Sequence, residues 1–432
     1  MLWTMWRRSI FRTIGIGGVA QSVSPAGISL RQLSSSTRRF AALWGNGDFG
    51  RLGLGNLESK WKPTMCPFFE DDPPIAISCG GAHTLFLTES GRVYATGLNN
   101  FGQLGTTTAK THVPEPFHIS GLADKVVQIS AGYHHSAAVT GEGTDTEDGK
   151  LFVWGKNSCG QLGLGKRAKS VVSTPTRVDS LDGIYIKMVS LGSEHSIAVT
   201  ADGNVLSWGS GVSGKLGHGH QSSILGFSFS SSEYMPRLIR NFEGLKIKKV
   251  SAGMLHSACI DERGSVFVFG EKAVGVLGFS EGKKVSEPSA VEKLPLSEEV
   301  ACGGYHTCIV TNDGKLYAWG SNENGCLGLG CTDVIRLPQI VESSFLKAPV
   351  SEVSCGWKHT AVVSDGNIFT WGWGGANGSF FEEEHSSGGQ LGHGNDFDYS
   401  QPMLLNLGRN VQALHVSCGF NHSGGIFEYS QN

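Results

Sequence analysis

Short apolar runs separated by glycine-rich turns recur along most of the chain. Residues 126–131, 136–140 and 150–155 predict three consecutive strands, and a shorter strand follows the next turn after a proline. Glycine contributes 61 of 432 residues, about twice its usual share, without a collagen-like triplet. Such a chain needs many tight turns with positive φ, so the pattern predicts an all-β protein.

One motif, a small residue followed by Gly-x-x-His-Ser/Thr, occurs seven times. Its copies are Cys79–Thr84, Ala131–Ser136, Leu191–Ser196, Ala252–Ser257, Cys302–Thr307, Cys355–Thr360 and Cys418–Ser423. Successive histidines are 50 to 63 residues apart, and aromatic-Gly pairs followed by Gly-x-Leu-Gly turns alternate with them. Four short strands per repeat are typical of a propeller blade, and seven repeats predict seven blades.

The two ends of the repeat region carry complementary halves of a blade. Residues 40–45 form a Trp-Gly strand that no histidine strand precedes, and residues 423–429 form a histidine strand that no Trp-Gly strand follows. Pairing them would hide two open sheet edges. The sequence therefore predicts a closed seven-bladed β-propeller over residues 40–432, with the final blade completed by the N- and C-terminal strands.

Residues 1–39 have a different composition from the rest. They contain six arginines and seven serines among apolar residues, and the first carboxylate of the chain is Asp48. This composition predicts a mitochondrial transit peptide and a matrix location, with a plastid as the alternative destination. Without these residues the formal charge falls from −3 to −9, which excludes a globally basic nucleic-acid footprint. The chain has no apolar run of 18 residues, so no membrane span is expected.

The repeated Trp-Gly, Gly-x-Leu-Gly and Gly-x-x-His-Ser/Thr elements resemble the repeat of the regulator of chromosome condensation family over residues 41–432. With its leader, the chain is most similar to the plant mitochondrial branch. The resemblance implies a non-enzymatic, monomeric protein-binding scaffold that supports organelle gene expression, through mRNA processing and splicing, and hence respiratory complex I biogenesis. It implies mitochondrial protein partners and RNA-containing complexes contacted indirectly.

Two other functions of the family are testable on the residues. Its founding activity is guanine-nucleotide exchange on the small GTPase Ran, through a wedge in an early blade; here the corresponding insertion, residues 373–387, is in the last repeat. The exchange factor is therefore the alternative function. The related UV-B photoreceptor uses tryptophans in repeated Gly-Trp-x-His-Thr motifs, and this chain has one, at residues 356–360. One tryptophan makes no cluster, so photoreception is disfavoured.

Two insertions carry aromatic residues that are candidates for partner contact, with local packing as the alternative. These candidates are Phe227, Phe229, Phe380, Phe381, Glu382, Glu383 and Glu384.

The seven motif histidines are expected to be structural, each bonded to backbone within its own blade. They are His83, His135, His195, His256, His306, His359 and His422. Equivalent positions point in seven directions about an axis and cannot converge on one metal ion. The adjacent hydroxyl lies on the opposite face of its strand, so it forms no catalytic pair with the histidine. We therefore expect no catalytic residues, cofactor or metal.

Overall fold

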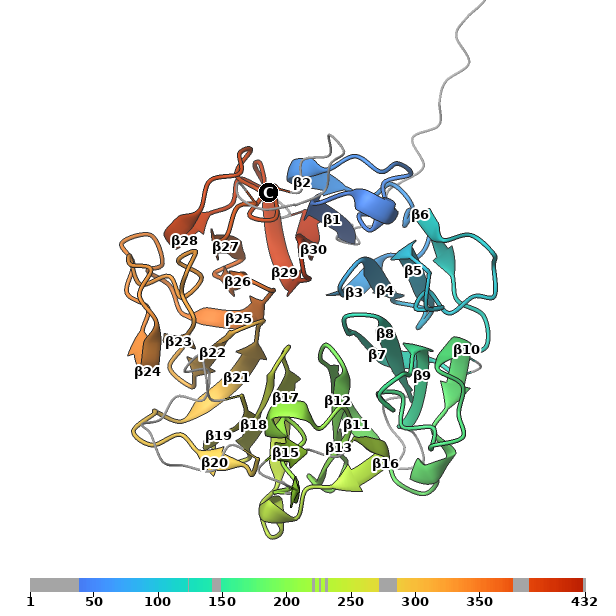
Figure 1. Ribbon diagram of the computed structural model, residues 1–432. Coiled ribbons are helices and arrows are strands. Elements are labelled where there is room, and N and C mark those ends of the chain that lie inside the picture. The colour runs from blue at the N-terminus through green and yellow to red at the C-terminus, as the bar shows by residue number, and fades with distance from the viewer. Residues whose placement is uncertain are drawn as a thin grey trace, which may run out of the picture. The chain divides into compact units, whose positions relative to one another are not determined.

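Seven four-stranded antiparallel sheets are arranged in a ring around a central axis (Figure 1). The computed structural model describes residues 39–122, 124–141, 149–219, 222–224, 227–229, 232–271, 286–375 and 388–429, all in the compact unit Thr37–Asn432. The predicted all-β, seven-bladed propeller is confirmed. The prediction of a transit peptide falls on residues outside those described, apart from Arg39.

Each blade runs from an innermost strand at the axis to an outer strand at the rim. The innermost strands are β3 (Pro74–Cys79), β7 (Val126–Ala131), β11 (Ile186–Leu191), β17 (Ile247–Ala252), β21 (Ser297–Cys302), β25 (Val350–Cys355) and β29 (Val411–Cys418). The second strands are β4 (His83–Thr88), β8 (His135–Thr140), β12 (His195–Thr200), β18 (His256–Asp261), β22 (His306–Thr311), β26 (His359–Ser364) and β30 (His422–Tyr429).

The outer half of each blade contains the Trp-Gly strand and a rim strand. The third strands are β5 (Val93–Leu98), β9 (Lys150–Lys156), β13 (Val205–Gly209), β19 (Val266–Gly270), β23 (Leu316–Gly320), β27 (Asn367–Gly372) and β1 (Arg39–Gly45). The rim strands are β6 (His112–His118), β10 (Val171–Arg177), β16 (Glu233–Leu238), β20 (Ser289–Ala290), β24 (Ile335–Ile340), β28 (Tyr399–Leu404) and β2 (Lys60–Met65).

Six short elements lie outside this scheme. They are the hairpin of β14 (Ser222–Ile224) and β15 (Phe227–Phe229) and the 3-10 turns Asp48–Gly50, Asp179–Leu181, Val212–Gly214 and Arg240–Phe242. No helical element in the described part of the chain is long and apolar enough to cross a membrane.

The two ends of the described chain close the ring in one blade, whose strand order is β2-β1-β30-β29. Strand β1 pairs antiparallel with β30 over its whole length, from Arg39 opposite Glu428 to Gly45 opposite His422. This confirms the predicted closure. Arg39, the last residue of the expected leader, is the first residue of β1, and its guanidinium lies 3.0 Å from the carboxylate of Glu89.

A closed ring of hydrogen bonds joins the seven second strands. Nε2 of each motif histidine lies 2.8 to 3.2 Å from the Ser or Thr hydroxyl oxygen of the next blade. The pairs are His83–Ser136, His135–Ser196, His195–Ser257, His256–Thr307, His306–Thr360, His359–Ser423 and His422–Thr84.

The expected histidine partner, backbone of the same blade, is therefore wrong for Nε2. A blade is covered on both faces by its neighbours, and consecutive residues of a strand point to opposite faces. The histidine consequently reaches the following blade, while the adjacent hydroxyl receives the histidine of the preceding one.

The hydroxyl groups fix which partner donates. Ser136 Oγ donates its proton to the carbonyl of Gln103 at 2.8 Å, and Trp154 Nε1 donates to the same carbonyl at 2.9 Å. In three other blades the equivalent hydroxyl and the equivalent tryptophan also donate to one shared backbone carbonyl, that of Gln161, Cys326 or Gln390. Because a hydroxyl has a single proton, it must accept from the histidine, which therefore carries its proton on Nε2.

Burial holds these imidazoles in the neutral form. All seven are fully buried, and their Nδ1 atoms have no hydrogen-bond partner. Desolvation disfavours the imidazolium ion and lowers the pKa of each below its ordinary value of about 6.5. The pKa is lowered to about 3 for His83, His135, His256 and His359, to about 4 for His306, and in the same direction for His195 and His422.

We expect the propeller to lose stability steeply as the pH falls below about 6.5. The folded-state pKa values lie below those of the unfolded chain, so the unfolded state takes up protons first and is favoured by acid. Each ring histidine should lower the free energy of unfolding by roughly 1 kcal/mol between pH 6 and pH 5. Urea titrations at pH 7, 6 and 5 measure this slope.

The variant His256→Gln supplies the control. Its amide can still donate to Thr307 but does not titrate, so the pH dependence should be shallower by roughly one proton. An unchanged slope would show that the ring histidines do not control acid stability.

Candidate functional site

One face of the propeller carries two sets of loops. The turns between first and second strands lie around the axis, and the connections between third and fourth strands emerge on the same side, because antiparallel strands alternate in direction. We call this side the loop face. It is formed by the turns at residues 80–82, 132–134, 192–194, 253–255, 303–305, 356–358 and 419–421 and by the described parts of the outer connections.

Backbone hydrogen bonds tie the inner turns to one another. The amide of the residue after the motif glycine donates to the glycine carbonyl of the next turn, as in Tyr133 to Gly192 at 3.1 Å. The other bonds of this kind join Gly81 to Gly132, Ser193 to Gly253, Met254 to Gly303, Gly304 to Gly356 and Phe420 to Gly80. A Cβ atom on Gly132 would lie 2.7 Å from the carbonyl oxygen of Gly192. Glycine is therefore required for the turns to approach, and the next residue is held at the channel mouth.

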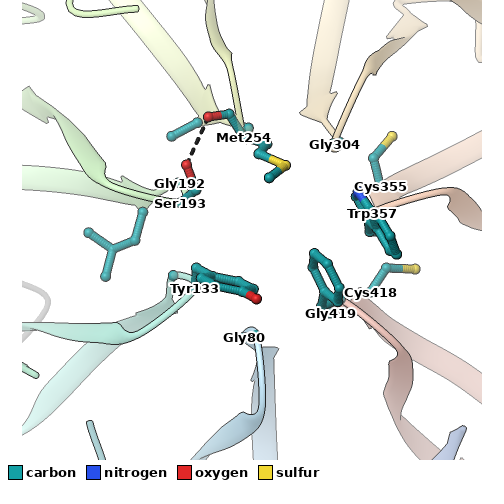
Figure 2. Close-up of a pocket in the computed structure, with 18 of the residues that line it drawn as sticks. Gly80, Tyr133, Gly192, Ser193, Met254, Gly304, Cys355, Trp357, Cys418 and Gly419 are labelled. Atoms are coloured by element: carbon teal, nitrogen blue, oxygen red, sulfur yellow. Dashed lines mark hydrogen bonds between the residues drawn. The ribbon is translucent and has the colours of Figure 1, made fainter. Parts of the chain in front are cut away.

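Aromatic side chains occupy part of this mouth (Figure 2). We define the mouth patch as Tyr133, Trp357 and Phe420; the buried Trp373 packs against it. The rings of Trp357 and Phe420 stack with centroids 4.2 Å apart, Trp373 meets Trp357 edge-on at 5.6 Å, and Tyr133 lies 5.2 Å from Phe420. The turn of Gly81 lies between the turns of Phe420 and Tyr133. Because Gly81 has no side chain, the rings of Phe420 and Tyr133 can contact each other.

Three cationic side chains each lie against an aromatic ring on the loop face, and one of these rings, Trp357, belongs to the mouth patch. Lys358 Nζ lies 5.0 Å from the centroid of Trp357, and Lys156 Nζ lies 5.7 Å from that of Phe101. Arg51 lies 5.7 Å from the ring of Phe49. Burial lowers the pKa of Arg51 to about 10, against the attraction of Asp48, so its guanidinium remains charged at neutral pH. Aromatic rings with adjacent cations are suited to binding protein surfaces.

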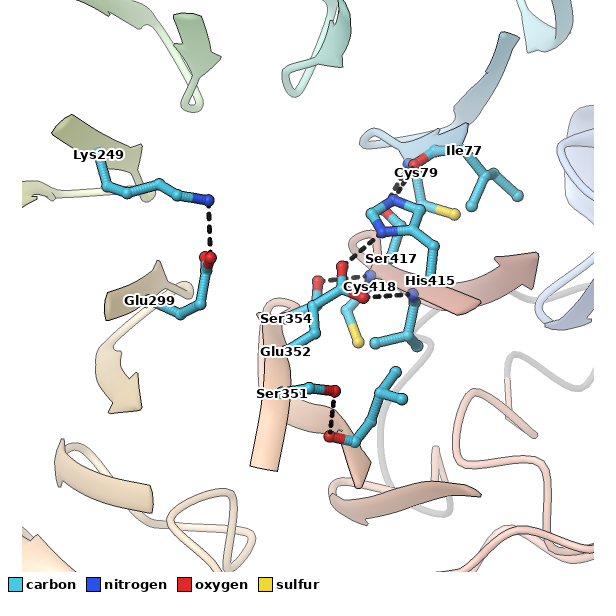
Figure 3. Close-up of polar contacts among 12 residues, drawn as sticks. Ile77, Cys79, Lys249, Glu299, Ser351, Glu352, Ser354, His415, Ser417 and Cys418 are labelled. Atoms are coloured by element: carbon cyan, nitrogen blue, oxygen red, sulfur yellow. Dashed lines mark hydrogen bonds and ion pairs between the residues drawn. The ribbon is translucent and has the colours of Figure 1, made fainter. Parts of the chain in front are cut away.

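The channel wall below the mouth is polar (Figure 3). On the innermost strands, serine hydroxyls accept hydrogen bonds from backbone amides of the following blade, as Ser354 does from Cys418 and Ser417 does from Cys79. Ion pairs also bridge the innermost strands of neighbouring blades, among them Lys249 with Glu299 at 2.7 Å and His415 with Glu352.

The histidine–hydroxyl pairs are not arranged as catalytic pairs. In a nucleophilic pair the histidine accepts the hydroxyl proton. Here the hydroxyl of Ser136 gives its proton to a carbonyl, and the neighbouring His83 donates to that hydroxyl. The pairs are therefore structural bonds between blades.

The structure describes little of the residues chosen from the sequence for partner contact. Phe227 and Phe229 lie in β15, which pairs with β14 in the connection between β13 and β16. Phe380, Phe381, Glu382, Glu383 and Glu384 lie outside the described residues. Both connections start on the loop face, at the ends of β13 and β27. The proposed roles of these residues stay predictions.

Sequence reasoning did not find the mouth patch. Tyr133, Trp357 and Phe420 occupy the motif position directly after the glycine. In the sequence this position bore only on the photoreceptor hypothesis, through its single tryptophan. The sequence did contain a usable signal. The same motif position recurs in all seven blades, so the side chains at that position must come together around the axis.

Comparison with known proteins agrees with the fold. The family model described as the RCC1-like domain matches residues 41–424. The Arabidopsis thaliana "Ultraviolet-B receptor UVR8" is 33% identical over 374 residues, which cover 84% of this chain and 76% of that protein. The human "E3 ubiquitin-protein ligase HERC2" is 31% identical over 363 residues, which cover 81% of this chain but only 7% of the ligase.

Solved structures also match. Prp20p of Saccharomyces cerevisiae, described with its binding to Gsp1p and histones, has a TM-score of 0.76 and 23% identity over 92% of this chain and 93% of its own. At this identity the match shows a common fold.

Replacing Glu352 with Gln should lower the pKa of His415. Burial lowers this pKa, but the charge of Glu352 and its hydrogen bond raise it on balance above the ordinary value. The stabilisation is therefore present at pH below about 6.5 and is lost as the pH rises through the folded-state pKa. An NMR titration of the imidazole protons measures the shift, and urea unfolding at pH 6 should show the lost stability.

Glu299→Gln is the matched control. Glu299 is paired with Lys249 and is the weakest of the contributions to the pKa of His415. It should move that pKa less than Glu352→Gln does, and equal shifts would contradict the assignment.

Proposed function

The chain belongs to the RCC1-like domain family, and from this premise we propose that it is a non-enzymatic scaffold whose loop face binds a partner protein. The observation that carries the proposal is the mouth patch: aromatic rings from separate turns that contact one another at the open end of the channel. Large, rigid aromatic side chains are the usual anchors of protein interfaces.

The surroundings of the patch support a partner with acidic groups next to apolar ones. Tyr133, Trp357 and Phe420 are half-buried, so each ring keeps a free edge or face while its position is fixed by packing. Lys358 lies against Trp357 and is also 3.3 Å from Glu323, an exposed pair that a partner carboxylate can replace at low cost.

The proposal extends to location and process. We place the protein in the mitochondrial matrix, as a scaffold for transcript maturation and splicing and hence for complex I biogenesis. The support is the arginine- and serine-rich, acid-free composition of residues 1–39 together with the resemblance to organelle-targeted family members. RNA would be contacted through protein partners.

Exchange on a small GTPase is the competing function. Two observations support it. The chain shares its fold with Prp20p, a protein described with its binding to Gsp1p. The sequence also carries an insertion between β27 and β28, in a connection that starts on the loop face. The photoreceptor function remains disfavoured, because Trp357 is the single tryptophan among the seven equivalent positions.

The double variant Trp357→Ala/Phe420→Ala should release the partner while the propeller stays folded. Truncated interface anchors typically cost about 2 kcal/mol or more each, so retention should fall by at least tenfold. The measurement is quantitative capture of the tagged chain from mitochondria, with and without RNase.

Tyr185→Ala is the control, since Tyr185 is a 37% exposed aromatic residue that precedes an innermost strand, on the side opposite the loop face. Equal loss in both variants, or loss in neither, would refute the loop face as the binding surface. Faster nucleotide release from a mitochondrial GTPase would instead favour the exchange factor.

The leader should be removed on the N-terminal side of Arg39. This residue belongs to β1 and forms ion pairs with Glu89 and Glu428, so a cut beyond it would remove contacts of the closing blade. Sequencing the N-terminus of the endogenous mature protein checks this. A mature chain that still begins at Met1, or a protein found outside mitochondria, would contradict the targeting proposal.

A further inference from the structure

One junction between adjacent blades brings two cysteines and a histidine together. His306 and Cys308 lie two residues apart on β22, and Cys355 ends the innermost strand β25 of the next blade. A ring nitrogen of His306 and the sulfur atoms of Cys308 and Cys355 all lie within 4.8 Å of one another. Within the described ranges, no other three His, Cys, Asp or Glu side chains gather this closely.

Packing does not require this pair of thiols. At the same junction in other blades, Ile197 lies with Ala252 and Leu85 with Ala131 in hydrophobic clusters, so aliphatic side chains fill both positions. Where a single cysteine occurs, its counterpart is a small residue: Cys302 is opposite Ala258, Cys418 is opposite Ala361 and Cys79 is opposite Gly424. Cys308 opposite Cys355 is the junction where both positions hold sulfur.

The polar ring of the channel wall is interrupted at the same junction. Six backbone amides of the innermost strands donate to the serine hydroxyl of the preceding blade; these serines are Ser78, Ser130, Ser190, Ser251, Ser354 and Ser417. The position that would serve Cys355 holds Ala301, which has no hydroxyl. Cys355 is partly exposed and lines the axial channel.

We propose that His306, Cys308 and Cys355 bind a thiophilic d10 cation, Zn(II) or Cu(I). Two thiolates and an imidazole are a donor set that both ions prefer. Zn–S bonds of about 2.3 Å in a tetrahedron place two sulfurs about 3.8 Å apart, so the site needs only a small closure. Water would complete the coordination of Zn(II) as a fourth ligand, whereas Cu(I) is satisfied by three.

Coordination through Nδ1 of His306 would leave the ring of blades intact. Nε2 of His306 is engaged with Thr360 at 2.9 Å, while Nδ1 has no hydrogen-bond partner and keeps its lone pair. Cysteine binds a metal ion as the thiolate. Each thiol that becomes a ligand gives up its proton to solvent, and affinity should therefore fall as the pH is lowered.

This site differs from the one excluded by the sequence. The expectation that the chain holds no metal rested on the divergence of the seven histidines, and they do diverge. The proposed site uses one of them together with two cysteines from neighbouring blades.

Titration of the reduced, chelator-treated full chain tests the proposal. We expect one equivalent of Co(II), as a spectroscopic probe for Zn(II), to give a thiolate charge-transfer band, and Cu(I) to be retained against a competing chelator in the other arm. Cys308→Ala and Cys355→Ala should each weaken binding at least tenfold. Both changes install a residue that other blades carry at that position, so the melting temperature reports that folding is retained.

Cys418→Ala is the matched control. Cys418 occupies the same strand position as Cys355, also lines the channel and faces an alanine, so its loss should leave metal binding unchanged. Uptake that survives in Cys308→Ala and Cys355→Ala, an absence of uptake in the wild type, or a Cys308–Cys355 disulfide formed in place of metal binding would each overturn the proposal. None of these readouts depends on the partner protein of the loop face.

Discussion

The structure depends on the hydrogen bond from a buried histidine to a hydroxyl group of the next blade. Seven such bonds return to their starting point, so every blade is both donor and acceptor and none is terminal. The imidazole that donates this bond is neutral, because desolvation between the blades disfavours the imidazolium ion. The hydroxyl in turn needs a carbonyl to take its proton, which the Gly-x-Leu-Gly turn supplies. Three motifs that look independent in the sequence are thus parts of one bonded unit.

Repetition made the fold accessible from the sequence, and contacts between repeats made the details inaccessible. Blade number and ring closure followed from the spacing of the histidines and from the incomplete first and last strands. The partner of His83 did not, because Ser136 is 53 residues away and becomes a neighbour only when blades pack face to face. Trp357 and Phe420 stack although 63 residues separate them, and no local pattern records that contact. The same limit hid the junction of Cys308 with Cys355.

The seven blades share one backbone arrangement but differ in the side chains at equivalent positions. The proposed binding sites lie at positions where these side chains differ. The turns around the axis share one backbone geometry. The residue after the motif glycine can therefore be glycine, methionine or aromatic without a change in the backbone. Three aromatic residues at this position contact one another because Gly81 leaves the space between two of them open. In the channel wall, one alanine in place of serine marks the junction that holds two thiols. A symmetric scaffold with single departures can thus carry distinct sites at fixed positions.

Closure between β1 and β30 also sets the order of events during synthesis. Strand β1 is the first part of the propeller to leave the ribosome, and its partner begins 377 residues after β1 ends. At about 5–20 residues per second, the edge of β1 waits roughly 20 to 75 s for its partner. Through that interval the nascent chain has an open sheet edge and an unclosed ring, so it is a substrate for chaperones until its last strand is released.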